Sequence, residues 1–176
     1  MNNLTQVLSE EHQNILKVIG AIKKECQLIE DGQTVDQEFF KTAIDFIRNY
    51  ADRWHHAKEE DILFKAMCQD EVAMHCNPVD QMLHEHDLGR DYIKNLETSL
   101  SNNNIKEILT NARGYAFLLA DHIFKEDNIL YPMADQVLSK DQQAKIKQEF
   151  RQVETDKFGP EVKDKYLNIV KTFEAR

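Results

Sequence analysis

The chain has 176 residues, of which 41% are hydrophobic and 30% are charged, and its formal net charge is −9 from 22 basic and 31 acidic side chains. Its lysines and arginines are scattered and form no basic stripe, so we expect no nucleic-acid partner. No apolar run approaches the roughly 18 residues that span a bilayer, and no signal peptide is visible at the N-terminus, so we expect a cytoplasmic protein without membrane contact.

The spacing of apolar residues predicts four long helices in the first three quarters of the chain. Their apolar positions recur with a period close to 3.6 residues. The polar stretches DGQT at 31–34 and SNNN at 101–104 interrupt this period, and Pro132 is expected to end or kink the last of the four helices. The predicted helices cover residues 4–30, 36–67, 78–100 and 105–131.

Two shorter helices are predicted after these four. Ser139 and Gln142 have the spacing of a capping box, which opens a helix that reaches FGP at 158–160, and a last helix follows to Phe173. The sequence thus predicts an all-α fold: an up-down-up-down four-helix bundle with two additional C-terminal helices. We expect the bundle over residues 1–135 and a packed helical extension over 136–176, which covers the bundle or forms the contact of a homodimer.

A repeated phrase marks the second and fourth helices. The sequence HHAKEEDILF at 55–64 recurs in similar form as HIFKEDNILY at 122–131. An α-helix advances about 100° per residue, so His55 and Glu59 face nearly the same way, one turn apart, and the same holds for the equivalent pair in the second copy. The two helices are diagonal partners in an up-down-up-down bundle, so the two pairs are expected to meet across the core about a pseudo-twofold axis.

The first and third helices carry a second repeat, Glu11-His12 and Glu85-His86. Counting residues from the helix ends places these histidines level with the pairs on the neighbouring helices. One layer of the bundle should therefore contain four imidazoles and two carboxylates. The predicted metal ligands are His12, His55, Glu59, His86, His122 and Glu126.

The chemistry of this layer indicates a metal site. Two buried carboxylates without a cation cost several kcal/mol each, so such groups must be paired, protonated or bound to metal. Imidazole and carboxylate ligands without thiolate favour iron, manganese or zinc over copper(I) or an iron–sulfur cluster. Six ligands exceed a tetrahedral zinc site, and bridging glutamates suit two metals. Two iron ions fit this set best, with zinc or manganese as the alternatives.

The motifs together resemble the hemerythrin-like, or HHE cation-binding, family. The resemblance covers about residues 5–135 and is carried by EHQNIL around His12, LHEHDLGR around His86 and the two copies of the repeated phrase. It implies a four-helix bundle that holds a non-haem di-iron centre, with histidines as terminal ligands and two carboxylates as bridges. Carried over residue by residue, it selects the same six ligands.

One feature departs from the oxygen-carrying members of that family, which place two histidines one turn apart on the third helix. Here the positions one turn from His86 are Met82 and Arg90. The resemblance therefore does not imply reversible oxygen carriage of that kind. Water, His56 or Glu60 is expected to fill the vacant position.

For three further side chains, those of His56, Glu60 and Tyr115, the sequence leaves open whether they belong to the metal site. His56 and Glu60 form an alternative ligand pair displaced by one residue, but the corresponding columns of the second phrase, Ile123 and Asp127, favour the first register. Tyr115 lies two turns before the last predicted histidine ligand; it is expected to pack in the core, and the alternative is a hydrogen bond or bond to a metal-bound oxygen species. His75 and His84 are expected at the surface.

Three functions follow from a metal pair in a bundle. The chain binds or senses a small diatomic molecule such as oxygen or nitric oxide, or iron itself. Alternatively, it is a di-iron enzyme that reduces oxygen, peroxide or nitric oxide, or that aids repair of iron–sulfur clusters. The third alternative is metal storage or a structural zinc site. The sequence leaves open whether the protein is an enzyme.

Overall fold

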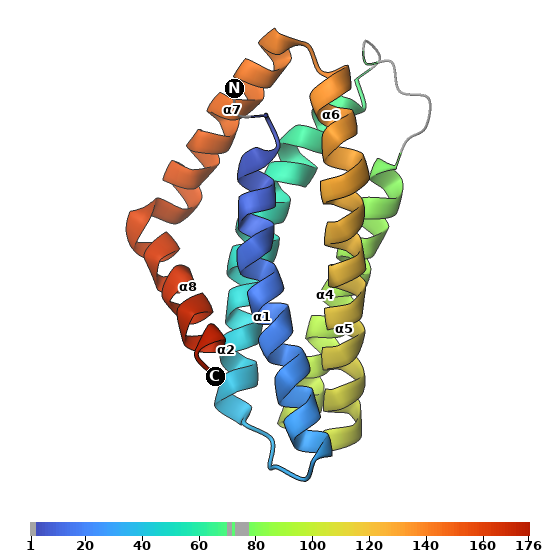
Figure 1. Cartoon of the computed structure of the whole chain (residues 1–176), viewed down its shortest axis with the longest axis vertical. Helices are drawn as coiled ribbons and strands as arrows, with labels where there is room; N and C mark the ends of the chain where they lie inside the picture. The colour runs from blue at the N-terminus through green and yellow to red at the C-terminus, as the bar shows by residue number, and fades with distance from the viewer. Residues whose placement is uncertain (1–2, 70–71, 73–77) are drawn as a thin grey trace.

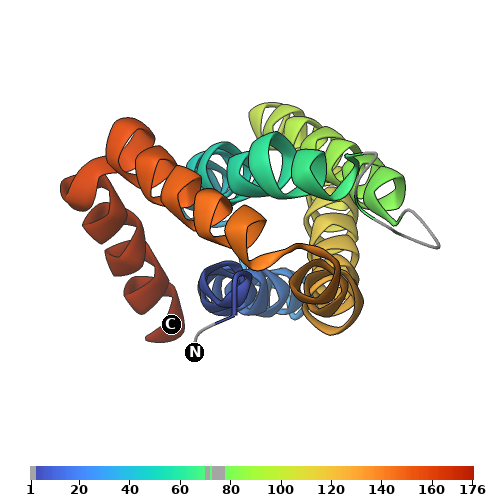
Figure 2. The ribbon, with the colours of Figure 1, turned by 90° about the horizontal axis from the view of Figure 1, so that it is seen from above.

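The computed structural model describes residues 3–69, 72 and 78–176. Within these residues the chain forms six continuous helices and no strand, which confirms the predicted all-α fold. Four long helices form the bundle, and two shorter C-terminal helices lean against one side of it (Figures 1 and 2). His75 and Cys76 lie outside the described residues, as does most of the segment that links the second and third long helices.

Some of these helices contain π-helical segments, labelled η. In chain order the elements are α1 (Gln6–Glu30), α2 (Gln37–Phe46), η1 (Ile47–His56), η2 (Glu59–Leu63), α3 (Phe64–Met67), α4 (Val79–Ser101), α5 (Ile105–Lys125), η3 (Glu126–Leu130), α6 (Tyr131–Val137), α7 (Lys140–Val153), η4 (Glu154–Phe158) and α8 (Gly159–Glu174). The second long helix comprises α2 to α3, and the fourth comprises α5 to α6. None of the described helices combines the length and apolar character needed to cross a lipid bilayer.

Side-chain caps and a glycine turn fix several helix ends, among them the predicted capping box at Ser139 and the predicted turn at Gly32. The side chains of Asp36 and Asn104 accept hydrogen bonds from the backbone N–H three residues later, at 3.0 and 3.3 Å. Ser139 and Gln142 form the predicted capping box, with bonds of 3.3 and 2.8 Å. Gly32 follows the end of α1 with a φ of +96°, a conformation that glycine adopts without steric cost.

The second and fourth long helices depart from the prediction in two ways. They are not α-helical throughout, because η1, η2 and η3 interrupt the α-helical hydrogen bonding. The fourth helix also does not end near Tyr131 but continues through Pro132 to Val137. Pro132 is the second residue of α6, directly after η3. A proline inside a helix lacks one backbone N–H donor, and π-helical turns are a usual way in which a helix departs from regular α-helical bonding at such a point.

Two hydrophobic clusters fill the bundle and leave a polar layer between them. One contains residues such as Ile22, Phe40 and Leu96, and the other lies at the opposite end, around Leu8 and Phe64. The helices after residue 139 contribute to both clusters: α7 to the second, and η4 and α8 to the first. They pack on the bundle through large apolar side chains, but the division into units 1–135 and 136–176 stays a prediction.

Candidate metal centre

The six predicted ligand residues all project into the polar layer. They come from all four long helices, and each side chain is at most 2% exposed. The histidines lie on α1, η1, α4 and α5, whereas each glutamate is the first residue of a π-helical segment, η2 or η3. The residues are His12, His55, Glu59, His86, His122 and Glu126.

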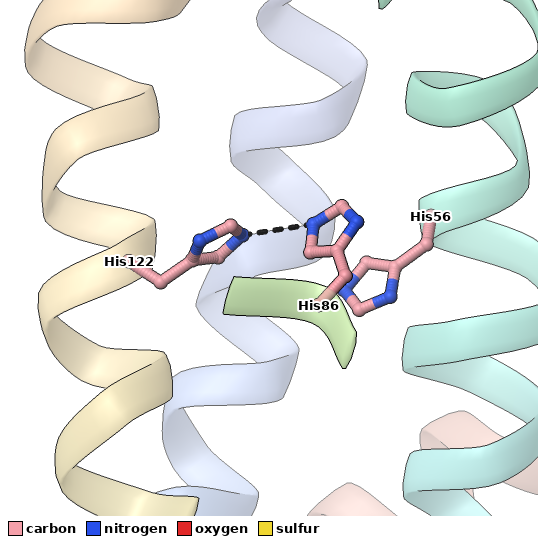
Figure 3. Close-up of side chains that lie close together, drawn as sticks. All are labelled: His56, His86 and His122. Carbon is pink, nitrogen blue, oxygen red and sulfur yellow. Dashed lines mark hydrogen bonds between the residues drawn. The ribbon is translucent and has the colours of Figure 1, made fainter. Parts of the chain in front are cut away.

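The four imidazoles form two pairs that face each other through their Nε2 atoms. The Nε2 atoms of His12 and His55 are 2.9 Å apart, and those of His86 and His122 are 3.0 Å apart. Figure 3 shows the second pair, in which the two rings approach from different helices with their nitrogens pointing toward each other. Each pair therefore offers two nitrogen donors to one point.

The two glutamates lie between these pairs. The Oε2 atom of Glu59 is 3.6 Å from Nε2 of both His55 and His86, one imidazole from each pair. The Oε2 atom of Glu126 is likewise 3.3 Å from His12 and 3.2 Å from His122. Each carboxylate thus spans the two imidazole pairs.

Three of the four glutamate oxygens in this layer have no hydrogen-bond partner among the described residues. They are Glu59 Oε2 and both oxygens of Glu126, and all are buried. The fourth, Glu59 Oε1, accepts a hydrogen bond from the Tyr131 hydroxyl. Buried carboxylate oxygens without a donor are costly, so the donor set fits cations placed between the imidazoles and the carboxylates. Among the described side chains His12, His55, Glu59 and Glu126 form one cluster that could hold a metal ion.

The two glutamates also differ in their electrostatic environment. Burial raises the pKa of the Glu59 carboxyl well above its usual range, and the neighbouring charge of Glu126 adds to this. Burial acts in the same direction on Glu126, but His122 and His12 beside it hold its pKa well below the usual range. Two carboxylates that share one buried layer cannot both ionise without opposing positive charge. Protonated His12 and His122 provide that charge for Glu126 in the absence of a metal, and a bound cation would provide it for both carboxylates.

An outer ring of carboxylates orients the four imidazoles. His55 Nδ1 donates to Glu11 Oε2 at 2.9 Å, and His122 Nδ1 donates to Glu85 Oε2 at the same distance. The other two histidines follow the same pattern, with Asp127 bonded to His12 at 2.9 Å and Glu60 bonded to His86 at 2.7 Å. Because every Nδ1 is engaged outward, every Nε2 is directed at the centre, as in carboxylate–histidine–metal arrangements.

Two lysines complete this ring. Lys58 is fully buried and pairs with Glu11, while Lys125 is partly exposed and pairs with Glu85. This outer ring is not among the predicted features, although both repeats contain its signal. The two lysines occupy identical columns of the repeated phrase, and each of the two glutamates directly precedes a ligand histidine.

His56 is the fifth imidazole of the layer. Its ring stacks on that of His86, with ring centroids 3.7 Å apart and ring planes at 10°. Figure 3 shows His56 and His86 next to each other. In an ideal α-helix it would lie about 100° around the axis from His55. Here His56 nevertheless reaches the layer from the last residue of the π-helical segment η1. His56, His86 and His122 form the second cluster that could hold a metal ion.

The other side chains whose part in the site the sequence left open lie at different places around the polar layer. Glu60 bonds to His86 Nδ1 and to Arg90, so it does not face the vacant position that the sequence analysis considered for it. Tyr115 is buried and lines a cavity between η1, α4 and α5. Tyr131, which the sequence analysis did not select, places its hydroxyl 3.3 Å from His12 Nε2. His84 is exposed, as expected.

The fold and this layer define a class of protein: a helical bundle with buried clusters of histidine and glutamate that are suited to a pair of metal ions. The family model described as the Hemerythrin HHE cation binding domain matches residues 3–134, and the chain belongs to this family. Comparison with curated proteins and with solved structures finds no match for the chain.

Proposed function

We propose that the chain binds two metal ions through the six predicted residues, with Glu59 and Glu126 as bridges. The observation that carries this proposal is the set of three buried glutamate oxygens without hydrogen-bond donors. Two of them, the Oε2 atoms of Glu59 and Glu126, each lie within 3.2–3.6 Å of imidazoles from both pairs. His12 and His55 would hold one ion, and His86 and His122 the other. His56 would serve as the additional nitrogen ligand of the second ion.

We further propose that the metals are iron. The candidate ligands number six, all imidazole nitrogens and carboxylate oxygens from His and Glu side chains. A structural zinc site takes four ligands, and histidine with carboxylate and no thiolate suits iron or manganese. The number and type of ligands therefore support iron or manganese over tetrahedral zinc.

A small-molecule role fits better than a closed structural site. A cavity reaches His56 and His86, so one end of the metal layer borders open space. A ferrous pair supplies the electrons for binding or reducing oxygen, peroxide or nitric oxide. The side chains of the chain itself orient the imidazoles through Nδ1 and keep Tyr131 as a hydrogen-bond donor to Glu59. We propose binding or sensing of such a diatomic molecule as the function; the cavity also favours a second candidate, an enzyme that turns the molecule over.

Metal content and absorption test this proposal. Protein purified without oxygen should contain two iron ions per chain by elemental analysis, and exposure to air should produce the charge-transfer absorption of a bridged ferric pair. One zinc ion per chain without such absorption would contradict the proposal and favour a structural site. Turnover of oxygen, peroxide or nitric oxide with an added reductant separates the enzyme from the sensor.

The role of His56 has its own test. His56→Ala should weaken the binding of one of the two ions by about tenfold or more, the scale on which supporting residues of metal sites act. His84→Ala is the matched control, because His84 is an exposed histidine on the neighbouring helix α4. Equal metal affinities for the two variants would remove His56 from the ligand set.

A further inference from the structure

A cavity of about 160 Å³ lies beside the half of the polar layer that contains His86 and His122, called here the His86 half. Its inner end is formed by His56 and His86, and Arg48 and Arg90 line it as well. An engineered apolar cavity of about 150 Å³ binds benzene, whereas one water molecule occupies only about 30 Å³ of liquid. The space therefore exceeds what a diatomic molecule fills. The rest of the wall is mostly apolar: Ile47, Ala51, Gly89, Ile93, Tyr115 and Leu119.

The wall offers a hydroxyl group as a hydrogen-bond donor. Tyr115 lines the cavity, its side chain is 3% exposed, and its hydroxyl oxygen is not among the buried polar atoms that are sealed off without a partner. Burial, and then the negative charge of Asp52, raises the pKa of this hydroxyl, so it remains a hydrogen-bond donor. A hydroxyl that is reached from the cavity can donate a hydrogen bond to a molecule bound there.

A glycine leaves this space open. A Cβ atom at Gly89 would lie 3.6 Å from the Tyr115 ring, which is an ordinary contact, so a side chain could be accommodated there. Glycine in a helix interior is less stable than alanine, and nothing in the backbone of α4 requires it. Gly89 lies three residues after His86. The residue three positions after His12, in the matching Glu-His copy on α1, is Ile15, whose side chain is buried in the core. The bundle is thus filled at this position in one half and hollow in the other.

The charges around the cavity are already paired within the protein. Arg90 bonds to Asp52 at 2.7 Å, and Arg48 forms a two-point pair with Glu97 at 2.7 and 2.8 Å. Glu85, which also lines the cavity, pairs with Lys125. An ionic ligand would find no unpaired counter-charge and would face both signs, so the wall favours an uncharged molecule.

We propose that this cavity binds a small, uncharged organic molecule of about six non-hydrogen atoms, one of which is an oxygen that accepts a hydrogen bond from Tyr115. The inference rests on the proposed function in one respect, namely that the bound molecule lies against metal-binding imidazoles. It extends that function from a diatomic ligand to an organic one. Binding itself depends on the apolar wall and the Tyr115 hydroxyl and does not require the metals.

Calorimetric titration of the full chain with cyclopentanone tests the proposal. Cyclopentane serves as the analogue without an acceptor, and cyclopentanecarboxylate and cyclopentylammonium as the charged analogues. Cyclopentanone should bind more tightly than the other three, both to the protein as purified and to the protein after chelation. Because metal content is measured on the same samples, loss of the metal centre and loss of cavity binding are recorded separately.

Two variants locate the binding. Gly89→Leu should fill the cavity and weaken cyclopentanone binding at least tenfold while metal content stays the same. Gly20→Leu is the matched control, since Gly20 is an exposed glycine inside α1 with open space around it. Tyr115→Phe should weaken cyclopentanone about threefold to tenfold, the range for one hydrogen bond, and leave cyclopentane unchanged.

Three results would overturn the inference: cyclopentanone binding no more tightly than cyclopentane, a charged analogue binding more tightly than either, or Gly89→Leu binding like the unaltered chain. If Gly89→Leu does not fold, Gly89→Ala takes its place. Its single added carbon meets Tyr115 at an ordinary distance, and it should weaken binding to a smaller extent.

Discussion

The two halves of the polar layer have equivalent outer residues but different residues around their imidazoles. Each half has two histidines held by carboxylates and one lysine that pairs with a carboxylate. Next to His12 lies the Tyr131 hydroxyl, whereas the ring of Phe64 lies beside His86 in the other half. The column that provides His56 on the second helix provides Ile123 on the fourth. A duplicated polar frame therefore carries two unlike candidate metal positions, and His56 and His86 of one of them line a cavity.

Removal of a bridging carboxylate should break both halves at once. Glu59→Ala or Glu126→Ala should reduce metal loading from two ions to one or none, because each carboxylate approaches imidazoles of both pairs. Elemental analysis of the purified variants measures this. Glu10→Ala, at an exposed position on α1, is the control and should keep the loading of the unaltered chain. Full loading of either bridging variant would contradict the shared role of the carboxylates.

The outer carboxylates should distinguish the halves by stability. Glu11→Gln leaves the fully buried Lys58 without its partner, and breaking a buried pair in this way costs about 3–5 kcal/mol. Glu85→Gln should cost clearly less, because Lys125 is 28% exposed and also pairs with Asp121. Urea unfolding of the two variants measures the difference. Equal losses would mean that the exposure of the lysine does not matter.

Chelation should affect both halves together. Metal that binds only the folded chain stabilises it by about 4 kcal/mol when free metal is a thousandfold above Kd. Removal should therefore lower Tm by roughly 10 °C for a chain of this length. Helix content, measured by circular dichroism, should remain because two hydrophobic clusters hold the bundle on either side of the layer. An unchanged Tm would place the metals outside the cooperative core, and loss of helix would show that apolar packing cannot hold the bundle alone.

The smallest expected effect is a pH dependence in the His86 half. Burial acts to raise the pKa of Glu60, but its bonds to His86 and Arg90 lower it to about 2. A depressed folded-state pKa adds stability that is fully present above the unfolded pKa, about 4.3, and that is lost as pH falls toward 2. In metal-free protein Glu60→Gln should therefore flatten the decline of unfolding free energy over this interval. The control Glu10→Gln should leave the slope as it is.

Much of the architecture could be predicted from the sequence because its signals are local or repeated. Apolar period and caps such as Asp36 and Ser139 depend on neighbours within one or two turns. The ligand layer followed from matched spacings such as that of His55 and Glu59, since level positions on packed helices must meet. That these six residues bind metal, and that the chain divides near residue 135, remain predictions.

The amino-acid sequence by itself determined the helices, their order and the residues that share the buried layer. Only the tertiary structure decided how the two halves differ. His56 reaches the layer by stacking on His86, a residue of another helix, and the period of its own helix does not contain that contact. The cavity depends on what three packed helices leave unfilled around Gly89 and Tyr115. Such features arise because side-chain direction and empty volume are properties of elements packed together, whereas the periodicity of one helix is a property of its own residues.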